Sequence, residues 1–426
     1  MANMITLELH APPTSVDVRV DFYDEEERHA LLATPTAPLF AGLPSLLHLP
    51  TTDLCAYYLY YKRRPGISGY SSHDDMVRQW TQALVEFDGQ VKFSSSSLHL
   101  TSATNMSSGT TERLGESIGL STISKLHGLH QADWTRIPIT KTRRTLDFQH
   151  IWTASDGKQF VQLETKGSAT NDNDHKTPSV CNHKAKIKEK KIQATNEERR
   201  KGILYGTIAV LDDRPDSVAR CWLVDPPADV PDNPHRFKIL TRLTYIADLI
   251  LFLAGRSALS ASLQTRLAAL SALPDIAPLD RVPLRKGNGT DYPETIFDFR
   301  GSHNPWFVGK SVVSDGPAGG QVYMVDSEHV MFIGLREELV VCATQQDFST
   351  IEQYSFPAGT IPKTVECVVP AGRFKGEFDP IIQVPDNLRS AGGGYVRFNL
   401  RGHLHYTQSG LVIGILPIPE SWHRRE

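Results

Sequence analysis

The sequence predicts a mixed α/β protein: a β-sheet flanked by helices, preceded by an α+β region and followed by a β-rich domain. Two strand-like runs surround an Asp156-Gly157 pair, helical runs lie on either side, and short apolar runs near the C-terminus are separated by Gly and Pro. Residues 1–100 are therefore expected to form an N-terminal α+β region, residues 101–278 a core with appended helices, and residues 279–426 the β-rich C-terminal domain.

Composition indicates an ordinary globular chain. The 426 residues are 40% hydrophobic and 22% charged, with a net charge of −3, which favours two to three domains. The five cysteines are dispersed without a CxxC pair, so we expect a reducing, cytoplasmic location and no structural zinc. The first ten residues lack a leader pattern, and the apolar run Ile246 to Ala254 is too short to span a bilayer.

The N-terminal region mixes both types of secondary structure. We expect strands at Met4 to His10 and Val16 to Phe22, a helix at Asp74 to Phe87, and a serine-rich linker from Ser94 to Thr111. The aromatic and basic run Tyr57 to Arg64 is typical of core packing, with base stacking as the alternative.

A β-hairpin is predicted in the middle of the chain. The runs Thr145 to Thr153 and Lys158 to Lys166 are strand-like, and Asp-Gly between them is the strongest two-residue hairpin signal. If Asp156 and Gly157 are the central turn residues, the register of the hairpin is fixed. The facing pairs are then Ser155 with Lys158, Gln149 with Glu164, and Asp147 with Lys166.

The triplet Glu164-Thr165-Lys166 is the main candidate for chemistry. Residues two apart on a strand share a face, and Glu164 would lie diagonal to Asp147 at roughly 7–8 Å, from which two carboxylates can share a cation. Other acid-x-Lys triplets occur in the chain, but this one follows an apolar strand and has an acid on the adjoining strand.

A helix upstream can add a third acid. Residues Thr110 to Leu126 read as helical, with Gly128 as the stop. Glu112 and Glu116 are one turn apart on one face, so either could reach a metal. We prefer Glu116, because Glu112 is near enough to the helix start to interact with the helix dipole instead. Gly115 and Gly119 would permit close backbone approach.

Downstream, the pattern continues as helix and strand. Asn182 to Lys201 has helical composition, Gly202 to Leu211 and Ala219 to Val224 are strand-like, and Phe237 to Leu273 reads as two helices broken near Gly255. The strand-like runs of the C-terminal region are Gln321 to Val325, Val330 to Ile333, Leu339 to Ala343, Thr364 to Val369, Gly394 to Leu400 and Gly410 to Leu416.

This arrangement of acids, lysine and predicted elements resembles the PD-(D/E)XK nuclease superfamily, whose restriction-endonuclease-like core is a helix, a three-stranded meander, a second helix and a further strand. The resemblance covers about Thr110 to Pro226, and Leu146 stands where many members have proline before the first acid. It implies Mg²⁺ or Mn²⁺ bound by Asp147, Glu164 and Glu116, with these acids and Lys166 as the catalytic residues.

The resemblance also implies a function: a DNA endonuclease of the restriction or genome-defence type, acting on double-stranded DNA as a homodimer. A catalytically silent nuclease-fold module for nucleic-acid binding or assembly is the alternative, and the complete set of two acids and a lysine favours the enzyme.

The charge distribution supports a polyanionic substrate. Residues 136–201 contain 15 basic and 8 acidic side chains, a local net charge of +7 in a chain of −3. Such a patch is typical of a track that contacts nucleic-acid phosphates, although charge does not distinguish DNA from RNA. The expected phosphate contacts are Lys141, Arg143, Arg144, Lys184, Lys188 and Lys191.

Overall fold

The computed structural model describes most of the chain. The described residues are 12–33, 37–61, 70–137, 148–154, 157–195, 203–224, 234–254, 258–280, 282–284, 307–308, 318–326, 328–370 and 395–418. They form two compact units, one containing Pro12–Gly69 and Gln82–Thr241, the other Tyr70–Thr81 and Arg242–Glu426. The sequence had suggested three regions.

The first unit is built on a mixed seven-stranded sheet with the strand order β2-β1-β9-β8-β7-β6-β5. Its strands are β1 (Ser15–Phe22), β2 (Leu46–Pro50), β5 (Thr135–Arg136), β6 (Phe148–Ala154), β7 (Gly157–Ala169), β8 (Ile203–Leu211) and β9 (Ala219–Val224). Its helices are α1 (Glu25–Leu32), α2 (Ala37–Ala41), α3 (Thr51–Leu59), α5 (Ser108–His127), α6 (Pro178–Thr195) and the second half of α4 (His73–Gln90).

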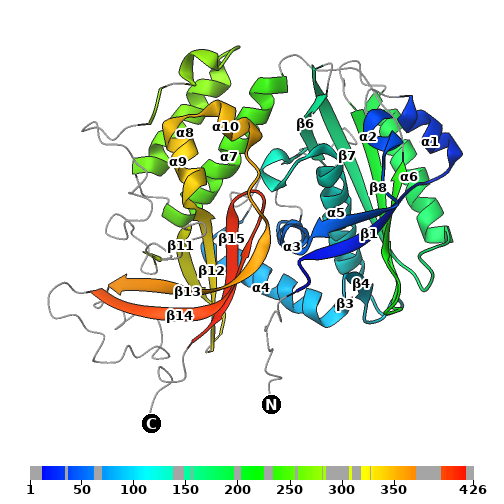
Figure 1. Ribbon diagram of the computed structural model, residues 1–426, viewed down its shortest axis with the longest axis horizontal. Coiled ribbons are helices and arrows are strands. Elements are labelled where there is room, and N and C mark those ends of the chain that lie inside the picture. The colour runs from blue at the N-terminus through cyan, green and yellow to red at the C-terminus, as the bar shows by residue number, and fades with distance from the viewer. Residues whose placement is uncertain are drawn as a thin grey trace, which may run out of the picture. The chain divides into compact units, whose positions relative to one another are not determined.

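Helices cover both faces of this sheet. Figure 1 shows α5 and α6 on opposite sides of it, with α6 connecting β7 to the parallel strand β8. Along the chain, α5 is followed by the antiparallel strands β5, β6 and β7, then by α6 and β8. Helix α3 packs on α5, where Tyr57 Oη lies 2.7 Å from Ser124 Oγ and Ser117 Oγ donates to the Leu54 carbonyl oxygen at 2.6 Å.

The predicted hairpin is present, but its register differs from the prediction by two residues. Ala154 pairs with Gly157, Gln149 with Gln162, and Phe148 with Leu163. Gly157 is therefore a strand residue rather than a central turn residue, and the predicted facing of Gln149 with Glu164 is wrong. Because side chains alternate with period two, a shift of two residues leaves every side chain on its expected face.

The N-terminal strand belongs to the central sheet and not to a separate region. Val18 of β1 pairs with Ala219 of β9 in parallel, and β2 adds to the other edge of β1. The expected linker from Ser94 to Thr111 instead contains half of a small hairpin, β3 (Val91–Ser94) with β4 (Ser97–Leu100), and the start of α5. The strand predicted at residues 4–10 lies outside the described residues.

Several other predicted elements are confirmed. Helix α5 ends at Gly128, whose φ of +63° is the left-handed conformation that favours glycine. Strand β9 has the predicted bounds, β8 and α6 begin within a few residues of theirs, and the aromatic side chains Tyr57, Tyr58 and Tyr60 are buried in the core. That burial rules out base stacking for these three tyrosines.

The second unit contains a six-stranded antiparallel sheet with the order β10-β11-β12-β15-β14-β13. The strands are β10 (Phe307–Val308), β11 (Ala318–Met324), β12 (His329–Arg336), β13 (Gly359–Pro370), β14 (Tyr395–Tyr406) and β15 (Leu411–Pro417). The helices are α7 (Pro234–Ala254), α8 (Ala258–Ala272), α9 (Glu337–Gln345), α10 (Phe348–Gln353) and the first half of α4; the first turns of α7 group with the first unit.

One predicted strand of this unit is a helix. Residues Leu339 to Ala343 were expected to be extended because they are apolar and partly β-branched, but they form the middle of α9. Leu339, Val340, Ala343 and Thr344 are buried, which is the spacing of one helix face. Gln346 ends the helix in the left-handed conformation with a φ of 56°.

The described helices were compared with the length and apolar character of a membrane-spanning helix. Within the described ranges, no helix combines the length and the apolar character that crossing a bilayer requires.

The partly buried His405 on β14 is expected to make stability depend on pH. Burial, and then the positive charge of His403, lower the pKa of His405 from 6.5 to about 4. Above pH 6.5 the imidazole is neutral in the folded and unfolded chain; between pH 6.5 and 4 only the unfolded chain gains the proton. The free energy of unfolding should therefore fall by up to about 3 kcal/mol over this interval.

Chemical denaturation of the wild type and of His405→Gln at several pH values measures this effect. The variant should lose less stability between pH 6.5 and 4, whereas parallel curves for the two proteins would contradict the assignment. Thr360 Oγ1 lies 2.8 Å from His405 Nδ1, so Gln is chosen to keep a polar partner for that hydroxyl.

Candidate active site

Strand β7 places Glu164 and Lys166 side by side on one face. Glu164 is fully buried and Lys166 is half-buried. The Lys166 ammonium donates to Glu164 Oε1 and, at 3.0 Å, to the Thr165 carbonyl oxygen. Active sites often contain a carboxylate and an ammonium group that are paired and shielded from bulk water.

Helix α5 comes unusually close to β7 next to this pair. A Cβ atom on Gly115 would lie 2.4 Å from Gly167 N and 2.6 Å from Lys166 C, and one on Gly167 would lie 2.0 Å from the Thr111 carbonyl oxygen. Gly119 is similarly close to Thr165 and Thr207. The predicted close approach at Gly115 and Gly119 is thus confirmed, and its contact point is the peptide that follows Lys166.

The two candidate helix acids lie on α5 near this contact, whereas Glu164 and Lys166 leave β7 on the face that α6 covers, since Glu164 pairs with Gly206 and Gly206 faces Ile187. Glu116, next to Gly115, is 4% exposed, whereas Glu112 is exposed and accepts a 2.5 Å hydrogen bond from the Tyr61 hydroxyl. Burial raises the pKa of Tyr61, and the hydrogen bond to Glu112 and the charges of Glu112 and Glu116 raise it further. Both acids therefore lie close to one phenol, and the preference for Glu116 stays a prediction.

His183 of α6 contacts the next peptide of β7, which links Gly167 to Ser168. Its Nε2 lies 3.0 Å from the Gly167 carbonyl oxygen. Burial lowers the pKa of His183, and the charge of Lys166 lowers it further while that of Glu112 raises it. The imidazole thus has Lys166, Lys186 and Glu112 as charged neighbours, and spacing along the chain does not predict that it approaches the triplet.

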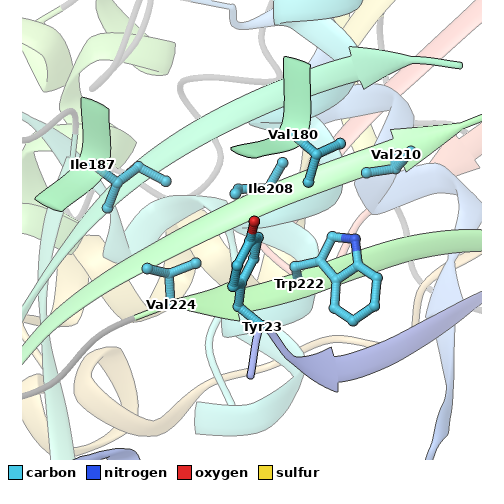
Figure 2. Close-up of a cluster of buried hydrophobic side chains, with 7 residues drawn as sticks. All are labelled: Tyr23, Val180, Ile187, Ile208, Val210, Trp222 and Val224. Carbon is cyan, nitrogen blue, oxygen red and sulfur yellow. The ribbon is translucent and has the colours of Figure 1, made fainter. Parts of the chain in front are cut away.

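A buried cluster fixes α6 against the sheet. Figure 2 shows Tyr23 and Trp222 among aliphatic side chains from α6, β8 and β9. Its members are Tyr23, Val180, Ile187, Ile208, Val210, Trp222 and Val224. The Ile187 side chain packs directly over Gly206, where a Cβ atom would lie only 2.6 Å from Ile187 Cγ2. This packing sets the position of His183 relative to β7.

Two of the predicted phosphate contacts are held in ion pairs. Lys184 Nζ lies 2.5 Å from Asp24 Oδ2 and 3.1 Å from Glu27 Oε1, and Lys188 Nζ lies 2.8 Å from Glu27 and 3.1 Å from Glu26. Burial alone would raise the pKa of Asp24, but the Lys184 hydrogen bond, the Glu27 amide and the Lys184 charge lower it overall. Lys184 and Lys188 therefore neutralise the start of α1.

The same acids are the candidate metal cluster found among the described residues. Carboxylate oxygens of Asp24, Glu26 and Glu27 lie within 4.8 Å of one another. Because Lys184 and Lys188 already contact all three, the group is an ion-pair network and not an argument for a metal. It is also distant in sequence from the predicted ligands Glu164 and Glu116.

The five remaining predicted site residues lie wholly or in their side chains outside the described residues. These are Asp147, Lys141, Arg143 and Arg144, together with the side chain of Lys191. The predicted facing of Asp147 with Lys166 therefore has no described counterpart, and the roles of these five residues stay predictions.

No family model, no curated protein and no solved structure matches this chain.

Proposed function

We propose that this protein is a metal-dependent nuclease that hydrolyses phosphodiester bonds, with a restriction-endonuclease-like core in its first unit. The observation that carries the proposal is the buried Glu164 paired with Lys166 on one face of β7, at the point where the backbone of α5 packs against the peptide between Lys166 and Gly167. A DNA endonuclease of the restriction or genome-defence type, acting as a homodimer, is the specific form that we favour.

The order of elements supports the same proposal. Helix α5, the antiparallel strands β5, β6 and β7, helix α6 and the parallel strand β8 follow one another. This is the order expected from the resemblance to the PD-(D/E)XK superfamily.

The available side chains are suited to Mg²⁺ or Mn²⁺. Both ions prefer hard oxygen ligands, and the buried carboxylates of Glu164 and Glu116 are of this kind. Asp147, which directly precedes Phe148 in the sequence, would be a further ligand. When bound, the ion would lower the pKa of a water molecule and offset the negative charge of the phosphate.

Lys166 and His183 would have separate roles. The Lys166 ammonium, adjacent to Glu164, would stabilise negative charge that develops on the phosphate and orient the attacking water. His183 would hold the Gly167 carbonyl, and with it the peptide between Gly167 and Ser168. Glu116 would position a water molecule or complete the ligand set.

A catalytically silent module that binds nucleic acid is the second candidate. The observation that favours it is the ion pair itself, since the Lys166 ammonium already contacts Glu164 and could simply neutralise a buried acid.

Cleavage assays test the proposal directly. The full chain is incubated with supercoiled plasmid and with single-stranded RNA, in Mn²⁺, Mg²⁺ or EDTA, beside Lys166→Ala. We expect cleavage that needs the metal and falls about 10²–10³-fold in the variant, as expected for loss of a group that stabilises the transition state. Equal cleavage by both proteins, or binding without any cleavage, would exclude the catalytic assignment.

A further inference from the structure

The lysines of α6 fall into two groups according to what they contact. Lys184 and Lys188 are four residues apart, on one side of the helix, and both pair with acids of the α1 region. Those acids are Asp24, Glu26 and Glu27, and Lys176 acts on Asp24 as well. The charges of Lys184 and Lys188 are therefore already offset by carboxylates, which leaves neither ammonium group available to a phosphate.

Lys186 lies on the other side of α6. It stands two residues from Lys184, which is about 200° around a helix of 3.6 residues per turn, and it is exposed. His183, three residues earlier, shares the side of Lys186 and reaches the Gly167 carbonyl oxygen at 3.0 Å.

Electrostatics connect Lys186 with the candidate active site. The positive charges of both Lys166 and Lys186 lower the pKa of His183, beyond the effect of its burial. Both ammonium groups therefore act on one imidazole, and that imidazole lies 3.0 Å from the Gly167 carbonyl oxygen of β7.

We propose that the backbone of a bound nucleic acid runs along the side of α6 that carries Lys186, next to Lys166, and that Lys184 and Lys188 make no phosphate contact. The proposal rests on the proposed function insofar as the ligand is a nucleic acid. The lysines of α6 would then have two different roles. Lys186 would bind phosphate, whereas Lys184 and Lys188 hold α1 against α6 through ion pairs.

Salt-dependent binding separates these tasks. Fluorescence anisotropy with a labelled DNA duplex, in EDTA to prevent cleavage, is measured with the full-length chain between 50 and 200 mM NaCl, conditions over which phosphate contacts dominate. Lys186→Gln is expected to weaken binding roughly 3–10-fold near 0.1 M salt and to reduce the slope of log K against log salt by about 0.9, the value for one lost phosphate contact.

Two further substitutions serve as controls for Lys186→Gln. Lys188→Gln makes the same chemical change on the opposite side of α6 and should leave the slope unaltered, while lowering the melting temperature. Lys186→Arg retains the charge and should restore the wild-type slope. An unchanged slope in Lys186→Gln, or a reduced slope in Lys188→Gln, would overturn the proposal.

Failure of the nuclease assignment gives a different result. If the wild type binds duplex but does not cleave it in Mn²⁺, the nuclease proposal fails while the Lys186 assignment is still decided by the slopes. If the duplex does not bind, single-stranded RNA is the second probe, and absence of binding to both polymers would reject the Lys186 assignment as well.

Discussion

Glu164→Gln is expected to reduce metal-dependent cleavage by at least about 100-fold and to leave the fold intact. Loss of a partner that merely orients a ligand costs roughly 10–100-fold in metal affinity or activity, and Glu164 is proposed as a direct ligand. The amide has nearly the volume of the carboxylate that it replaces, and its oxygen can still accept the hydrogen bond from Lys166. Single-turnover cleavage across a Mn²⁺ titration measures the loss.

The control for this substitution is Glu189→Gln, which makes the same change on the exposed surface of α6. Its cleavage rate and Mn²⁺ dependence should match the wild type. Circular dichroism of both variants checks that the fold persists. A Glu164→Gln enzyme that cleaves at the wild-type rate would show that Glu164 serves only to neutralise Lys166.

Gly115→Ala is expected to destabilise the first unit by about 1–3 kcal/mol, the usual range for overpacking a well-packed core. The added Cβ would lie within 2.4–2.6 Å of backbone atoms of Lys166 and Gly167, and backbone cannot rotate away as a side chain can. The strain has to exceed the gain of roughly 1 kcal/mol that alanine brings to a helix. Urea unfolding measures the difference.

Gly109→Ala on the same helix is the comparison. Its Cβ would meet nothing nearer than Ser107 Oγ at 3.9 Å, so helix propensity alone should act and stability should be unchanged or slightly higher. If both variants unfold at the same urea concentration, the close contact between α5 and β7 is not as rigid as the distances imply.

Local sequence signals predicted the elements around the site better than their pairing. The Asp-Gly pair correctly indicated a hairpin, and strand alternation placed Glu164 and Lys166 on one face. The register was wrong because Gly157 pairs with Ala154 as a strand residue. A shift of two residues leaves the alternation of side chains unchanged, so the pattern of apolar residues could not reveal it.

Contacts between segments that are distant in the sequence could not be predicted from local patterns. The lysine-rich composition of α6 suggested one phosphate track, but Lys184 and Lys188 meet acids about 160 positions earlier in the chain. His183 likewise approaches Gly167 only because Val180 and Ile187 fix α6 on the sheet. Neither relation follows from spacing or composition.

The α9 error has a physical cause as well. Leu339, Val340 and Ala343 have the apolar, partly β-branched character of a strand, and propensity is a weak guide when burial against other elements decides the conformation. The acids Glu337 and Glu338 in its first turn are the feature that favours a helix at this position.

The pairing of β1 with β9 also means that two neighbouring strands of the sheet are synthesised far apart in time. Val18 leaves the ribosome about 200 residues before its partner Ala219, and at 5–20 residues per second this delay is roughly 10 to 40 seconds. During that time the nascent N-terminal strand has β2 to pair with but lacks its inner neighbour. Chaperones that shield exposed strand edges should therefore engage this chain early, before β9 emerges.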